Sequence, residues 1–351
     1  MTLRSLVLAF TLILQLPAGA QSGLTEPERT FNLTELFLGS AVQGSAPSIE
    51  FLADDIVALC RHVSNGSCLI SVVKWDRDGV HGLGSMLAEH QGLIGRAGAD
   101  HIFTTSLVFP TSSLYSIVSQ TTQSIPFIRL DLASASGRLA GETTGTNWTL
   151  YTLVPTAGQL RQGTGTLLSV SDAKVAIRHG NIISTETLDG SAIGSFTVKP
   201  ETKCFTNATL LNDALFLNTC GEHYIVSWSG KRLLKIHQPP GNPKRIATDE
   251  SGTRLLLDYS TRNVSPVQSA AEVAVTVASL GAGAPEQFDN GEAVRVIDTK
   301  TGAVCFQWQT RLSRTDAFFS HASITPSGQF VAVAGPSALT VYRLPEKCSG
   351  R

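Results

Sequence analysis

The sequence predicts an all-β fold, a single β-propeller of six or seven four-stranded blades. Short runs rich in Val, Ile, Leu, Phe and Thr recur between Gly, Asp, Asn and Ser turns, whereas amphipathic patterns with a 3.6-residue period are scarce after residue 20. Polar turns also return at comparable spacing, and three of the five intervals between them fit a blade of about 40 to 45 residues. These turns lie at Asp55, Asp100, Asp172, Asp213, Gly252 and Gly328.

The C-terminal repeat shows the unit most completely. It runs from a strand at 323–325 through a turn at 326–328, a strand at 330–334 and a turn at 335–337 to a strand at 339–344. Candidate third strands, each followed by a glycine, lie at 72–76, 128–131, 225–228 and 294–298. A closed ring gives every such sheet two neighbours and removes the exposed edges, so the repeats are expected to form one.

Two of the intervals between turns are longer than one blade. Residues 147–154, in the first long interval, are strand-like, so six blades are visible and a seventh stays open. In the second, residues 263–291 are rich in Ala, Ser, Val, Gly and Pro with few charges. We expect this stretch to be a loop inserted between the second and third strands of one blade, and to be cut first in limited proteolysis.

The N-terminus has the pattern of a secretory signal peptide. Arg4 precedes an apolar run from Leu6 to Leu16, and small residues precede a cut after Ala20. The alternative is an N-terminal anchor helix, although the run is shorter than the roughly 20 residues that a span requires. No later stretch approaches that length. A secreted or periplasmic protein without a membrane span after signal cleavage is therefore expected.

The expected domain organisation follows from these features. Residues 1–20 are the signal peptide, 21–47 an N-terminal segment, 48–346 the β-propeller and 347–351 a C-terminal tail. Within the N-terminal segment, residues 30–37 alternate between apolar and polar side chains. They are a candidate for the strand that closes the ring, and a disordered leader is the alternative.

The six cysteines form an even set, which is typical of disulfides in an oxidising compartment. Cys60 and Cys68 flank an Asn-Gly turn signal, so they are expected to face each other on neighbouring strands. Cys204 and Cys220 lie almost symmetrically about a turn, and Cys305 and Cys348 pair by elimination. A metal site is the weaker alternative, because the sequence has no Cys-x-x-Cys.

The repeats resemble those of WD40 and related YVTN-type β-propeller proteins over most of the chain after the signal peptide. The stretches that carry the resemblance are residues 296–302 and 324–333, where an Asp-containing turn is followed by a Pro-x-Gly hairpin. The sequence departs from strict WD40 repeats, since Trp-Asp occurs once, at Trp75 and Asp76, and only His321 lies near the place of the Gly-His histidine. The resemblance implies a divergent propeller and a binding platform, without a particular ligand.

The composition and the motifs exclude several classes of function. A formal charge of −1 offers no field for nucleic acid, and the 42% hydrophobic content argues against disorder. The chain has no Gly-x-Ser-x-Gly, no P-loop and no Gly-x-Gly-x-x-Gly. The Asp76–Gly79 stretch lacks the later ligands of a calcium loop and is interpreted as a turn. We therefore assign no catalytic, cofactor-binding or metal-ligating residue from the sequence.

Two functions remain. The first is a non-enzymatic secreted or periplasmic propeller whose loops present a face to a protein or a small-molecule ligand. The alternative is a propeller hydrolase or lactonase with a metal in the central channel, which would need several oxygen or imidazole ligands from different blades. The largest candidate loops for binding are residues 62–67, 238–245 and 263–291, with Lys244 and Arg245 as an adjacent basic pair interpreted as ordinary surface.

Overall fold

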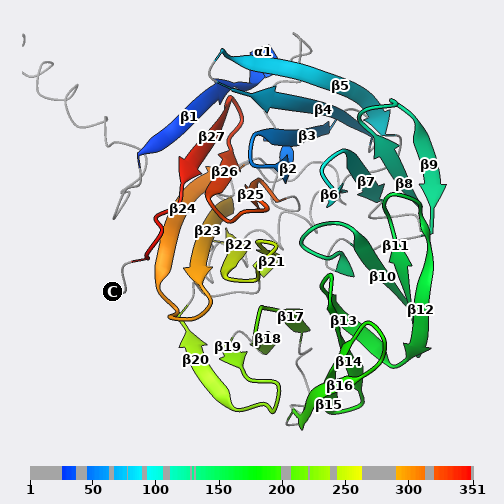
Figure 1. Cartoon of the computed structure of the whole chain (residues 1–351). Helices are drawn as coiled ribbons and strands as arrows, with labels where there is room; N and C mark the ends of the chain where they lie inside the picture. Colours follow the sequence, from blue (N-terminus) through cyan, green and yellow to red (C-terminus); the bar gives the residue numbers. More distant parts are fainter. Residues whose placement is uncertain are drawn as a thin grey trace, which may run out of the picture.

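The chain forms a closed ring of seven antiparallel sheets in the computed structural model (Figure 1). The structure describes residues 26–36, 46–62, 67–76, 78–88, 93–105, 111–126, 129, 132–198, 207–219, 222–237, 243–262, 290–312 and 320–348. In this part of the chain six sheets have four strands and one has three, so the all-β propeller prediction is confirmed with seven blades.

We number the blades in chain order and give the strands of each from the ring centre outwards. Blade 1 has β2 (Ser48–Ala53), β3 (Ile56–His62), β4 (Cys68–Trp75) and β5 (Val80–Ala88); blade 2 has β6 (Leu93–Ala97), β7 (His101–Thr105), β8 (Ser112–Ser116) and β9 (Thr122–Ile125); blade 3 has β10 (Leu139–Thr144), β11 (Asn147–Thr152) and β12 (Gly158–Thr164).

The other four blades continue round the ring. Blade 4 has β13 (Thr166–Val170), β14 (Lys174–His179), β15 (Ile182–Thr187) and β16 (Ala192–Thr197); blade 5 has β17 (Asn207–Leu210), β18 (Leu215–Thr219), β19 (Glu222–Val226) and β20 (Arg232–Ile236); blade 6 has β21 (Pro243–Thr248), β22 (Arg254–Arg262), β23 (Asn290–Asp298) and β24 (Val304–Leu312); blade 7 has β25 (Ala322–Ile324), β26 (Phe330–Ala334), β27 (Ala338–Arg343) and β1 (Pro27–Asn32).

Blade 3 is the seventh blade, which the sequence did not decide. Its inner position is taken by Ala133, which forms a single bridge with Ala140 of β10. The turn after this bridge ends at Gly137, whose φ of 72° is in the left-handed region that favours glycine. The spacing of the sequence did not indicate this turn between strands, and the residue pattern predicted a third strand at 128–131. The third strand of blade 2 is instead β8, so the position assigned to this stretch is wrong, and apart from Arg129 the stretch lies outside the described residues.

The ring is closed by strands from both ends of the propeller. β1 pairs antiparallel with β27, from Pro27 with Tyr342 to Asn32 with Ala338, and Figure 1 shows the two strands side by side. The expected strand at 30–37 is too long, because α1 (Leu33–Leu36) follows β1 directly. Leu33 and Leu36 pack in the core between blades 7 and 1, which a continuing strand would not allow both to do.

The turns between the first and second strands hold neighbouring blades together. Hydrogen bonds link these turns across six of the seven blade junctions in the part of the chain that the structure describes. In ring order they run from Gly98 N to Ser136 O, Ser136 Oγ to Asp172 Oδ1, Lys174 Nζ to Asn212 O, Asn212 N to Gly252 O, Glu250 N to Pro326 O and Ser327 N to Asp54 Oδ1. The repeated polar turns of the sequence therefore form one end of the central channel.

Two disulfides lie in the described residues. Cys60 on β3 is bonded to Cys68 on β4, with Cα atoms 5.6 Å apart. Cys305 on β24 is bonded to Cys348 beyond the last strand, with Cα atoms 4.6 Å apart. Cys204 and Cys220 lie outside the described residues, as does the segment 1–20. Among the residues described, no helix has the length and hydropathy to cross a membrane.

Candidate binding channel

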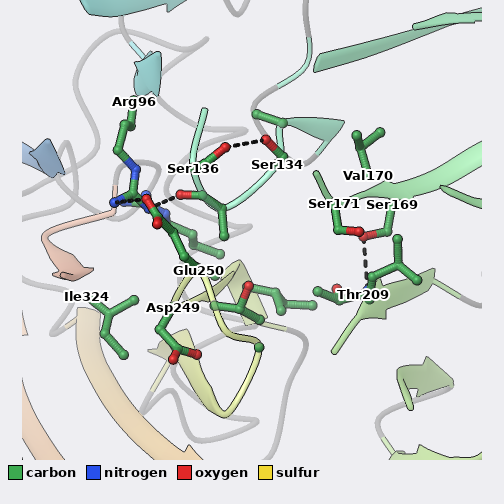
Figure 2. Close-up of a pocket in the computed structure, with 18 of the residues that line it drawn as sticks. Arg96, Ser134, Ser136, Ser169, Val170, Ser171, Thr209, Asp249, Glu250 and Ile324 are labelled. Atoms are coloured by element: carbon green, nitrogen blue, oxygen red, sulfur yellow. Dashed lines mark hydrogen bonds and ion pairs between the residues drawn. The ribbon is translucent and has the colours of Figure 1, made fainter. Parts of the chain in front are cut away.

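The central channel contains a cavity of about 680 Å³ that residues from all seven blades line (Figure 2). Serine and threonine side chains from several blades recur in its wall, among them Ser134, Ser136, Ser169, Ser171, Thr209 and Thr248. Apolar side chains such as Val170 and Ile324 lie between them. A cavity of this size with convergent polar groups has the character of a small-molecule site.

Arg245 on β21 ties three blades together at the channel wall. Its guanidinium donates to Glu50 Oε2, to Ile49 O at 3.2 Å and to Ala322 O at 3.1 Å. Its neighbour Lys244 also belongs to the inner strand, and its side chain is only 11% exposed. The sequence interpretation of this basic pair as ordinary surface is wrong, because both cations line the cavity and pair with buried carboxylates.

A buried carboxyl pair adjoins the channel at Lys244. Lys244 Nζ lies 2.6 Å from Glu292 Oε1 and 3.5 Å from Asp258 Oδ1, and both carboxylates are fully buried. Ser320 Oγ donates to Asp258 Oδ2 at 2.7 Å. Burial raises the pKa of Asp258 well above its usual range, and the neighbouring Glu292 carboxylate adds to this. The cluster fastens β22 and β23 of blade 6 to the start of β25.

Arg96 is a buried cation in the channel wall. It lies on the inner strand β6 and is 5% exposed, and its Nη2 donates to Ala135 O in blade 3. Nε and Nη1 have no hydrogen-bond partner among the residues described. The carboxylate oxygen Oε1 of Glu250 in blade 6 lies 4.0 Å from Nη1. Figure 2 shows the Arg96 side chain reaching toward Glu250. Burial lowers the pKa of Arg96, although Glu50, Glu250 and Asp172 oppose this effect.

A second cavity of about 850 Å³ continues from the turn end of the channel. Glu250 and Ser136 line both cavities, so they stand where the two meet. The Glu250 side chain is 49% exposed, whereas the Arg96 side chain opposite is buried. Glu250 therefore lies at the boundary between the channel cavity and the cavity beside the interblade turns, and Arg96 lies on the channel side.

Asp76 and His321, two further residues singled out from the sequence, have structural partners. Asp76 accepts hydrogen bonds from the backbone of Asp78 at 2.8 Å and of Gly79 at 3.2 Å, and these contacts lower its pKa. His321 is fully buried, with Nδ1 2.8 Å from Pro47 O. In the described ranges, no three His, Cys, Asp or Glu side chains gather as a metal site would require. Residues 63–66, 238–242 and 263–289 of the candidate loops lie outside those ranges.

Arg96 was missed by sequence reasoning, although a signal for it exists. It is the one charged residue in the strand Leu93–Ala97, directly before the turn at 98–100. This single charge in an apolar strand beside a turn is the signal in the sequence from which Arg96 could have been selected.

Comparison with known proteins supports the fold. No family model matches the sequence, and no curated protein matches it. A chain of the mitotic checkpoint complex superposes with a TM-score of 0.52 at 10% identity, covering 94% of this chain and 97% of its own. Hsv2 from Kluyveromyces marxianus gives 0.47 at 10% identity, covering 82% and 89%, and the C-terminal WD40 domain of Sif2 gives 0.43 at 12%, covering 86% and 97%. The chain therefore has a divergent WD40-like β-propeller fold.

Proposed function

We propose that the protein is a non-enzymatic, secreted or periplasmic propeller that binds a small molecule in its central channel. The cavity of about 680 Å³ supports this proposal most strongly. Its volume falls in the range of roughly 300 to 1,000 Å³ that is usual for ligand pockets, and a few polar groups converge in it. The wall is fixed by hydrogen bonds between blades, so the cavity is formed before a ligand arrives.

Location outside the cytosol is supported by the disulfides. Cys60–Cys68 and Cys305–Cys348 are bonded in the structure, and such bonds persist in oxidising compartments. N-terminal sequencing of the protein recovered from its native host tests this part of the proposal. A mature chain beginning at Gln21 is the expected result, and retention of residues 1–20 contradicts it.

A thermal-shift screen of small polar metabolites tests binding in the channel. A ligand that binds the folded protein stabilises it by RT ln(1 + [L]/Kd). Thr209→Phe places a bulky ring in the cavity wall and is expected to abolish the shift. Thr197→Phe, on the exposed outer strand β16, is the matched control and should keep it. A shift that persists unchanged in Thr209→Phe places the ligand elsewhere.

The hydrolase alternative has its own readout. Metal analysis of the purified protein, with assays on lactones and phosphoesters, distinguishes the two functions. The binding proposal expects no stoichiometric divalent metal and no turnover. Metal-dependent turnover that is lost on substitution of a carboxylate in the channel would overturn it.

A further inference from the structure

We infer that Arg96 binds an oxyanion, a carboxylate or phosphate group, of the molecule that occupies the central channel. This inference rests on the proposed function and names the chemical group that the channel recognises. It follows from the burial of Arg96, from the state of its three guanidinium nitrogens and from the carboxylates around it.

The buried guanidinium of Arg96 has N–H groups that lack a hydrogen-bond acceptor among the described residues. Nη2 is satisfied by Ala135 O, but Nε and Nη1 have no hydrogen-bond partner in the described part of the chain. An arginine always carries its charge, and leaving its N–H groups unpaired away from water costs free energy. A group of this kind in the wall of a cavity is complementary to an acceptor that enters the cavity.

The carboxylates near Arg96 mostly have other partners. Glu50 accepts from Arg245, and Asp172 accepts from Ser136 at 2.6 Å. Glu250 is the remaining one, and its 4.0 Å separation from Nη1 is too long for a hydrogen bond. Because about half of the Glu250 side chain is exposed, it can turn toward the second cavity when another anion takes its place.

The turn beside Arg96 fixes the direction of its guanidinium. Ser134 and Ser136 hydroxyls lie 3.1 Å apart, and Ser136 donates to Asp172, so the turn is tied to blade 4. Backbone amides of Arg138 and Leu139 donate to the same two hydroxyls. Ala135 O is thereby held against Nη2, and this contact keeps the guanidinium at the cavity wall. Such preorganisation reduces the entropy lost when a ligand binds.

An oxyanion suits this site better than a hydroxyl group. Guanidinium N–H groups only donate, and the ionised oxygens of a carboxylate or phosphate accept, so each contact is charge-assisted. A neutral hydroxyl would instead bridge Nη1 and Glu250, accepting from one and donating to the other. The two ligand classes therefore predict opposite roles for Glu250. It repels an oxyanion, whereas it would help to hold a hydroxyl.

The test titrates the full mature protein with malonate, inorganic phosphate and glucose at constant ionic strength, by calorimetry. Malonate or phosphate should bind at one site per chain. Glu250→Gln should bind the anion about tenfold more tightly, because a like charge near the site is removed. Arg96→Gln should weaken binding by at least about tenfold, and Arg343→Gln, at an exposed ion pair with Glu28, should leave it unchanged.

The outcomes separate this inference from the proposed function. Tighter binding of malonate than of phosphate assigns a carboxylate ligand, and the reverse order assigns a phosphate. Weaker anion binding in Glu250→Gln, or equal binding in Arg96→Gln and the wild type, overturns the oxyanion site. Glucose binding that Thr209→Phe abolishes and Arg96→Gln does not would overturn it too, while leaving the channel as the binding site. Because Glu250 is exposed, its variant decides the question even if Arg96→Gln fails to fold.

Discussion

Leu33→Ala tests whether the N-terminal segment is an integral part of the ring. Leu33 is fully buried in α1 between blades 7 and 1, and its backbone N donates to Ser337 O at 3.0 Å. The substitution removes three carbon atoms, worth about 2.4 kcal/mol at roughly 0.8 kcal/mol each. The cavity that remains raises the cost to as much as about 5 kcal/mol. We expect the free energy of unfolding to fall by about 2.5 to 5 kcal/mol.

Urea unfolding followed by tryptophan fluorescence measures this change. Trp75 packs in the same core region, with its ring centroid 5.7 Å from those of Phe31 and of Phe51, so it reports on the closure. Glu35→Ala, in the same helical turn but exposed, is the control and should change stability by less than about 0.5 kcal/mol. If Leu33→Ala matches that control, the N-terminal segment is not packed as the structure has it.

Three further predictions concern one turn, one disulfide and one histidine. Gly137→Ala should destabilise the fold by more than about 1 kcal/mol in urea unfolding, because its φ is positive and a Cβ there would overlap the carbonyl of Arg96. Replacing both Cys305 and Cys348 should lower the free energy of unfolding by about 4 kcal/mol, because this disulfide joins residues 43 positions apart. Replacing Cys60 and Cys68, which are 8 positions apart, should lower it by about 2.5 kcal/mol, and equal losses contradict the loop-entropy argument. Burial lowers the pKa of His223 below its ordinary 6.5, so the unfolded chain binds a proton at this histidine more readily than the folded chain does. The free energy of unfolding should therefore fall as the pH drops through 6.5. His223→Phe should reduce this fall, and an unchanged pH profile of stability would refute the role of His223.

The turns were the part of the fold that the sequence predicted best. Asp172 and Gly252 lie in turns that hydrogen-bond to neighbouring blades, so their residue types are constrained by backbone conformation and by contacts. The turn at Gly137 has the same role, but it follows a single bridge at Ala133 rather than a strand. Its apolar pattern was too short to be recognised. The local sequence thus predicts a polar turn well, but it does not predict an inner position that consists of a single β-bridge.

The channel could not be assembled from the sequence, because its residues come from separate blades. Lys244 and Arg245 follow a Pro-rich stretch that is typical of an exposed connector. Their burial becomes visible only when Glu50 and Glu292 are placed beside them by the closing of the ring. Ion pairs between residues so far apart in the sequence leave no local pattern, so the sequence alone indicates surface cations at these positions.

Arg245 and Arg96 show how the channel wall produces a site. Inner strands are sheet edges, and their carbonyl groups toward the channel lack a neighbouring strand. Arg245 donates to two of these strands, at Ile49 O and Ala322 O, and Arg96 donates to Ala135 O in the turn after the bridge of blade 3. Arg245 therefore binds inner-strand carbonyls, and Arg96 binds a carbonyl of the turn that follows the bridge at Ala133. Arg245 is hydrogen-bonded to the carboxylate of Glu50, whereas Arg96 has no hydrogen-bonded carboxylate among the described residues, and Glu250 lies 4.0 Å from its Nη1. Of these two arginines of the channel wall, Arg96 is thus the one that can bind an anion in the channel.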